Sequence, residues 1–172
     1  MDSRGLRELT LTALFVALVT VATMVVQVPV PATGGFINVG DTMIFVAALV
    51  GGPKAGLIAG GLGSALADLL SGYAMWAPWT LVIKGLEGLL AAVLAFRAYR
   101  MRGALSVATL AGLAIAGLWM VLGYYVAGGI IRGFAPALTE VPGNLIQAFG
   151  SVILATPVLM ALRGLNVTDR TR

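Results

Sequence analysis

Lys84 and Glu87 are a pair of residues whose types and spacing could do chemistry. They stand three residues apart inside an apolar stretch, so on a helix they share one face and can form an ion pair. Asp68, near the end of the preceding apolar stretch, is another partner for Lys84 across two helices. Charged side chains in such segments are paired, buried or functional. These three residues therefore either hold helices together or bind polar groups of a ligand.

The residue types and motifs that most enzymes need are missing. Cys and His are both absent, which excludes disulfides, thiolate nucleophiles, His general bases and the common zinc sites. The sequence has no GxxxxGK[ST] P-loop, no HExxH and no DxxD cluster. Its GGLGSA stretch lies inside an apolar segment instead of following a strand, so it is not a dinucleotide fingerprint. We predict a protein that is not an enzyme, with no metal site and no cofactor.

The composition predicts a membrane protein. Hydrophobic residues make up 59% of the 172 residues and charged residues only 10%, with a mean hydropathy of +0.99, whereas soluble domains carry about 25% charged residues. We therefore expect an all-α integral membrane protein, multi-pass in the cell membrane, with residues 1–172 forming one compact domain. The net charge of +4 comes without a basic cluster interleaved with aromatics, so no nucleic-acid partner is expected.

Hydropathy predicts a bundle of six transmembrane helices, over about 6–28, 41–52, 54–71, 79–99, 104–130 and 143–163. The second is only about 18 Å long at 1.5 Å per residue, too short for a hydrocarbon core of roughly 30 Å. Either it continues into the preceding loop, or that loop dips into the protein. Asp41 is placed to cap the start of this helix.

The basic residues predict that both termini are cytoplasmic. With the N-terminus inside, nine of them fall on the inner side: Arg4, Arg7, Lys54, Arg97, Arg100, Arg102, Arg163, Arg170 and Arg172. The outer loops hold only Arg132. This asymmetry follows the positive-inside rule.

This topology places most polar and large aromatic residues in the outer half of the bundle. A pore would carry polar residues through its whole depth, whereas here the inner half is nearly pure Ala, Leu, Val and Gly. We predict a pocket that opens outward and is closed below by packed helices. The residues predicted to line or support it are Asn38, Asp68, Tyr73, Trp76, Trp79, Lys84, Glu87, Tyr125, Asn144 and Gln147.

The aromatic and amide side chains favour a small, polar, heteroaromatic guest. Trp and Tyr faces stack on flat rings, and amides pair with hydroxyls and ring nitrogens. The aromatics could instead form an interfacial belt, and Asn144 and Gln147 could join helices. Gly34 and Gly35 make the first outer loop either a mobile lid or a passive connector.

A stripe of small residues runs along the third predicted helix. Gly52, Gly56, Gly60, Ser64 and Asp68 recur every four residues and so share one face. In lipid such a face lets two helices pack closely. We favour packing inside the bundle over a docking surface for another protein.

Four features together resemble a known family. They are the six-helix chain of this length, the Ala13-xxx-Ala17 pair in the first helix, the block NVGDTMIFVAALVGGPKAGLIAGGLGSALADLLSGYAMWAPWTLVIKGLEG over 38–88, and the stretch PGNLIQA over 142–148. They are similar to the S components of energy-coupling factor (ECF) vitamin transporters, in the riboflavin and hydroxymethylpyrimidine group. S components are the membrane subunits that capture the substrate.

The resemblance implies a function and a set of partners. A vitamin would bind in the outward pocket under the first outer loop. Ala13 and Ala17 would dock onto a transmembrane coupling subunit driven by two cytoplasmic ATPases, and the S component would topple in the membrane to release its cargo. Riboflavin is slightly favoured over hydroxymethylpyrimidine, thiamine and pyridoxine as the substrate. The alternatives are a stand-alone secondary transporter or channel for a small polar solute, and an assembly protein without a ligand.

Overall fold

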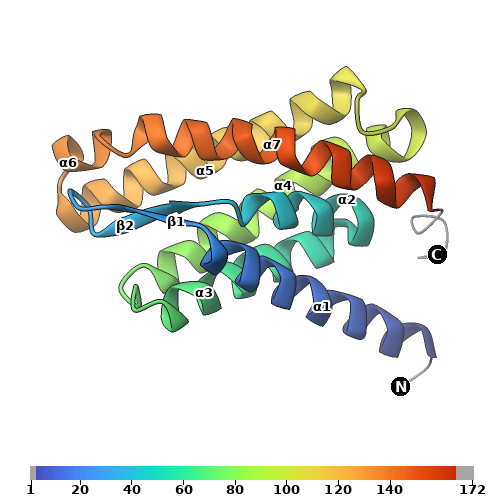
Figure 1. The fold of residues 1–172 in the computed structure, drawn as a ribbon, viewed down its shortest axis with the longest axis horizontal. Coiled ribbons are helices and arrows are strands. Elements are labelled where there is room, and N and C mark those ends of the chain that lie inside the picture. Colours follow the sequence, from blue (N-terminus) through green and yellow to red (C-terminus); the bar gives the residue numbers. More distant parts are fainter. Residues whose placement is uncertain (1–2, 166–172) are drawn as a thin grey trace.

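The computed structural model describes residues 3–165 and confirms an all-α membrane bundle that carries one small hairpin (Figure 1). Its elements are α1 (Ser3–Val25), β1 (Gln27–Val30), β2 (Gly35–Asn38), α2 (Asp41–Ile58), the π-helical turn η1 (Ala59–Gly63), α3 (Ser64–Leu70), α4 (Ala77–Arg102), α5 (Val107–Arg132), α6 (Phe134–Leu138) and α7 (Val141–Gly164). Within the described part of the chain, five helical stretches are long and apolar enough to cross a membrane: Gly5–Val25, Asp41–Leu70, Ala77–Arg102, Val107–Arg132 and Phe134–Gly164.

The second of these stretches reverses direction at Gly52. This residue has φ of 82° and is followed by Pro53, a combination of positive φ and a missing amide donor that interrupts a helix. Gly60 lies against the side chain of Ile44, although a straight helix would hold residues sixteen apart at about 24 Å. The stretch is therefore two antiparallel limbs, and the boundary predicted between 52 and 54 coincides with the reversal.

The first helix ends at Val25, whereas the sequence predicted an end at about residue 28. Residues 27–30 instead pair antiparallel with 35–38, with Gln27 opposite Asn38 and Val30 opposite Gly35. The hydropathy of this segment continues that of the helix, but Pro29 disfavours a helical conformation in the residue before it. The first connection is thus an ordered hairpin that folds over one end of the bundle (Figure 1).

The glycine stripe packs inside the bundle, as we favoured. A Cβ on Gly56 would meet the carbonyl of Gly88 at 2.5 Å, and a Cβ on Gly60 would meet the carbonyl of Lys84 at 2.3 Å. The second limb and α4 therefore approach backbone to backbone. Gly52, the first member of the stripe, forms the reversal itself. Around this contact lie fully buried apolar side chains from α1, α2, α5 and α7, namely Val19, Ile44, Phe45, Leu49, Leu113 and Leu159.

The two ends of the bundle differ in charge. Figure 1 shows that α1 begins and α4 and α7 end at one end, whereas the hairpin and α6 lie at the other. The elements at the first end carry Arg7, Lys54, Arg97, Arg100, Arg102 and Arg163, and Arg132 ends α5 beside α6. Arg170 and Arg172 lie outside the described residues, and so does the side chain of Arg4. We call the first end the Arg-rich end.

Candidate functional site

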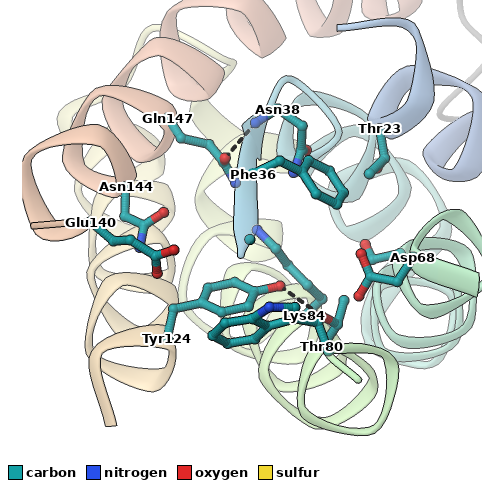
Figure 2. A pocket seen from close by; sticks show the side chains of 13 residues that line it. Thr23, Phe36, Asn38, Asp68, Thr80, Lys84, Tyr124, Glu140, Asn144 and Gln147 are labelled. Atoms are coloured by element: carbon teal, nitrogen blue, oxygen red, sulfur yellow. Dashed lines mark hydrogen bonds between the residues drawn. The ribbon is translucent and has the colours of Figure 1, made fainter. Parts of the chain in front are cut away.

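A cavity lies under the hairpin, enclosed by α3, α4, α5 and α7 (Figure 2). Its volume is about 30 Å³, which is room for about two water molecules. Its lining residues are mostly polar: Thr23, Gly35, Phe36, Asn38, Ser64, Asp68, Trp76, Thr80, Lys84, Tyr124, Glu140, Asn144 and Gln147. The structure therefore brings together six of the predicted site residues, which are Asn38, Asp68, Trp76, Lys84, Asn144 and Gln147.

Lys84 is the centre of a buried charge network. Its ammonium pairs with the carboxylate of Asp41 and lies 3.1 Å from Oε2 of Glu87. Gln147 donates from Nε2 to Oδ2 of Asp41 at 2.8 Å. The predicted Lys84–Glu87 pair is present, and Glu87 supports the site from behind Lys84 without lining the cavity. A buried ammonium paired with two carboxylates fixes the position of one charge in an otherwise apolar bundle.

The prediction that Asp41 caps its helix was wrong. The cap position is Gly40, which makes no side-chain cap bond and whose own amide donates to Oδ1 of Asn38. The carboxylate of Asp41 is used by Lys84 and Gln147 instead. Asp41 still stands in the first helical turn, where the positive end of the helix dipole stabilises an anion.

Asp68 faces the cavity from α3, on the side opposite Glu140 and Asn144 (Figure 2). It is buried, and its Oδ2 has no hydrogen-bond partner among the described residues. Lys84, its predicted partner, forms its ion pairs with Asp41 and Glu87 instead. Because an unpaired buried carboxylate oxygen is costly, Asp68 is suited to accept a hydrogen bond from a ligand.

One wall of the cavity is aromatic. The rings of Trp76 and Tyr124 have centroids 6.0 Å apart, and the Tyr124 hydroxyl is 3.0 Å from Oγ1 of Thr80. The Lys84 ammonium lies 5.5 Å from the Tyr124 ring centroid, within reach of a cation–π contact. The wall thus combines ring faces with a hydroxyl and a cation.

Among the predicted aromatic residues on helices, Trp79 and Tyr125 do not line the cavity. The structure places Tyr124 there and turns Tyr125 onto Phe134, with ring centroids 5.6 Å apart, because neighbouring residues of a helix point about 100° apart. Trp79 is half-buried and packs beside the cluster that contains Trp76. Both corrections concern which face of a helix a residue occupies.

The hairpin is bonded to the helices on both sides of the cavity. At its tip, the Thr33 hydroxyl donates to the Glu140 carboxylate, and Trp76 Nε1 donates to the Gly34 carbonyl at 3.1 Å. At its base, the backbone amide of Asn38 donates to Oε1 of Gln147 at 2.7 Å. These contacts make the hairpin an ordered cover.

Phe36 reaches down from the hairpin beside the cavity (Figure 2). It packs against Tyr73, with ring centroids 4.6 Å apart and planes at 53°. Tyr73 therefore supports the hairpin without lining the cavity itself.

Seven lining residues were missed from the predicted set: Thr23, Gly35, Phe36, Ser64, Thr80, Tyr124 and Glu140. Glu140 could have been predicted as a site residue, because it is an acidic residue directly before an apolar helix on the predicted outer side. Phe36 and Gly35 belong to a segment whose strand pairing was not predicted. The hydroxyl residues of transmembrane helices also bond their own backbone, so their type alone does not mark a site.

A family model described as the S component of ECF-type riboflavin transporters matches residues 5–164. The chain belongs to this family. The match confirms the resemblance seen in the sequence. This S component is therefore a multi-pass membrane protein and a transport subunit for a vitamin or vitamin precursor, and it is not an enzyme.

Two relatives and one solved structure are similar to the chain. A Pyrococcus woesei protein described as an uncharacterized protein in gap 3'region is 40% identical over 137 residues, 79% of this chain and 88% of its own. The thiamine precursor transporter HmpT of Lactococcus lactis subsp. cremoris (strain MG1363) is 28% identical over 156 residues, 90% of this chain and 87% of its own.

The solved structure is that of the S component of a bacterial ECF transporter. It superposes with a TM-score of 0.69 at 19% identity and covers 93% of this chain and 97% of that one. At this identity the likeness shows that the fold is shared. Association with an ECF energizing module is a property of S components as a family.

Proposed function

We propose that this S component captures a single-ring vitamin precursor of the hydroxymethylpyrimidine class, which carries an amino and a hydroxyl group. The observation that carries the proposal is a cavity of about 30 Å³ with Asp68 on one wall and Glu140 and Asn144 on the other. A carboxylate accepts from an exocyclic amino group, and an amide pairs with hydroxyls and ring nitrogens. The cavity is too small for even a single ring, so a ligand between Trp76 and Phe36 requires the cavity to widen.

Riboflavin is the second candidate, because the matching family is described by that vitamin. Its three fused rings and ribityl chain need far more room than this cavity has. The relative described as a thiamine precursor transporter is consistent with the smaller ligand. The pyrimidine needs the smaller expansion of the cavity, and the two acidic walls offer acceptors for its amino group, so we favour it.

The proposal includes an orientation in the membrane. The Arg-rich end faces the cytoplasm under the positive-inside rule, so the hairpin and the cavity face outward. With the reversal at Gly52 counted as a turn, the chain then crosses or enters the bilayer six times, and both termini are cytoplasmic. A cysteine introduced at Ser71 should react with an impermeant thiol reagent from outside, and one at Lys54 only after the membrane is permeabilised.

The proposal also includes the partner surface. Ala13 and Ala17 are exposed on α1, next to Leu14 and Leu18, which are exposed as well. Small side chains on an exposed helix face let another helix approach closely. We assign this face to the coupling subunit of an ECF module that also holds two cytoplasmic ATPases.

Calorimetry on the purified protein tests the ligand. We expect hydroxymethylpyrimidine to bind more tightly than riboflavin, thiamine or pyridoxine. Asp68→Asn and Asn144→Ala should each weaken binding about tenfold or more, as loss of a hydrogen bond to a charged or buried group does. Glu8→Gln, which removes an exposed carboxylate at the Arg-rich end, is the control and should bind as the wild type.

Two results would contradict the proposal in different ways. A yellow preparation that retains riboflavin would contradict the ligand class. Unchanged affinity in both cavity variants would contradict the site.

A further inference from the structure

A second, larger cavity lies at the Arg-rich end of the bundle. It has a volume of about 720 Å³ and lies between the first half of α1, the reversal of α2 and the end of α4. It shares no lining residue with the vitamin cavity. Its inner wall includes Phe15, Val50 and Ala55, which belong to the main packed core. We call this cavity the basal groove.

The basal groove has one apolar wall and one cationic wall. The apolar wall is formed by Leu11, Phe15, Val50, Ala55, Phe96 and Met101, and the cationic wall by Arg7, Arg97 and Arg100. The single acidic lining residue is Glu8, whose Oε1 is 2.9 Å from Nζ of Lys54. With three arginines and one glutamate, the described lining of the groove has a net positive formal charge.

The cationic wall is partly held in place by the fold. The Arg100 guanidinium lies 5.8 Å from the centroid of the Phe96 ring, and the backbone carbonyl of Arg100 accepts from Arg163 at 3.3 Å. Arg7 and Arg97 stand exposed on α1 and α4, across the groove from each other. Guanidinium groups on two helices can bind phosphate oxygens from two sides.

We propose that the basal groove binds one anionic phospholipid of the surrounding membrane. The phosphate would lie between Arg7, Arg97 and Arg100, and an acyl chain would follow the apolar wall past Leu11 and Phe15. Basic pockets between transmembrane helices near the headgroup level bind anionic lipids for this reason. The groove offers cations for a headgroup phosphate and apolar side chains for an acyl chain, which are the two parts of a phospholipid.

A lipid explains the groove better than a free anion or an acidic peptide. A phosphate ion would fill a small part of 720 Å³ and would make no contact with most of the apolar wall. An acidic peptide would neutralise the arginines but would leave the same wall exposed. A phospholipid uses both walls at once.

Native mass spectrometry of the full-length protein tests this inference. Phosphatidylglycerol and phosphatidylcholine with the same acyl chains are added to the protein in detergent, and the retained lipid is counted. We expect the wild type to prefer phosphatidylglycerol. The variant with both Arg7→Gln and Arg97→Gln should lose that preference about tenfold or more, as loss of charge-assisted hydrogen bonds implies. Arg97→Lys should keep part of it.

Arg132→Gln is the matched control, because it removes one positive charge at the other end of the bundle. It should retain phosphatidylglycerol as the wild type does. Vitamin binding by the double variant shows that it is folded, because the two cavities share no residue. Equal retention of both lipids by the wild type, or an unchanged preference in the double variant, would overturn the inference. Displacement of the lipid by inorganic phosphate alone would show an anion site and overturn it as well.

Discussion

The hydroxyl of Thr33, at the tip of the hairpin, donates a hydrogen bond to the carboxylate of Glu140, 107 residues further along the chain. Both residues are buried. This bond fastens the hairpin that covers the cavity to the start of α7, on the side where Asn144 faces the cavity (Figure 2).

Thr33→Val should loosen the cover. A hydrogen bond to a charged group contributes about 1.5–3 kcal/mol, so we expect the bound vitamin to dissociate about tenfold faster or more. Stopped-flow measurement of dissociation gives the rate. Thr139→Val removes an exposed hydroxyl that bonds the local Pro136 carbonyl and should leave the rate unchanged. An equal rate in the two variants would show that the Thr33 bond does not hold the cover.

Lys84→Met should destabilise the protein strongly. The change leaves Asp41 and Glu87 buried without their cation, and breaking a buried ion pair from one side costs about 3–5 kcal/mol. Lys54→Met is the matched control, because the Lys54–Glu8 pair is exposed and such pairs contribute about 1 kcal/mol or less. Unfolding in SDS gives both free energies. Equal losses would contradict the buried network.

Tyr124→Phe and Tyr125→Phe should differ in their effect on vitamin binding, although the two residues are neighbours in the sequence. Tyr124 lines the cavity and bonds Thr80, whereas Tyr125 packs on Phe134. We expect Tyr124→Phe to weaken vitamin binding about three- to tenfold, as loss of one neutral hydrogen bond does. Tyr125→Phe should bind as the wild type. Calorimetry decides, and the reverse order of effects would place Tyr125 at the ligand.

Gly88→Ala should push two helices apart. A Cβ at this position would overlap the Gly56 carbonyl, whereas nothing lies within 4 Å of a Cβ on Gly150. Overpacking costs about 1–3 kcal/mol, so Gly88→Ala should lower the free energy of unfolding by that amount. Gly150→Ala, in the open part of α7, should keep or raise it. A loss no larger in Gly88→Ala than in Gly150→Ala would rule out the close backbone contact.

Ala13→Trp together with Ala17→Trp should prevent assembly with a coupling subunit and leave vitamin binding intact. Both residues are exposed, so the larger side chains can be accommodated without disturbing the core. Copurification of the tagged S component with the ECF module measures assembly. Ala111→Trp, an exposed alanine on α5, is the control. If the double variant assembles normally, this face of α1 is not the docking surface.

Hydropathy and charge predicted most of the fold because each helix must be apolar over its length. They placed the reversal near Gly52 and the basic residues at one end. They missed the end of α1, because QVPV is as apolar as a helix and only Pro29 marks the change. A hairpin built from backbone pairing leaves little trace in hydropathy.

The sequence predicted how far along each helix the site residues lie, but not toward which side of the helix their side chains point. Lys84, Asp68, Asn144 and Gln147 were found because polar side chains are rare in apolar helices. Tyr125 was chosen over Tyr124 because two adjacent aromatics give no indication of which one faces inward. Asp41 was taken for a cap because its pairing with Lys84 joins residues 43 positions apart, a separation that no local pattern reveals.

The short first limb of α2 has a consequence for how the vitamin gains access. Because this limb covers only residues 41–51, its start lies at the level of Lys84 and Glu87, and the base of the hairpin continues into the bundle. There the Asn38 side chain accepts from the Gly40 amide at 2.8 Å, and Gly40 packs against Thr23 with no room for a Cβ. Backbone at this depth must stay bonded to protein. The hairpin is therefore anchored at its base by Gly40 and held at its tip by the bonds of Thr33 and Gly34 to Glu140 and Trp76, so any opening of the cavity must first break the bonds at the tip.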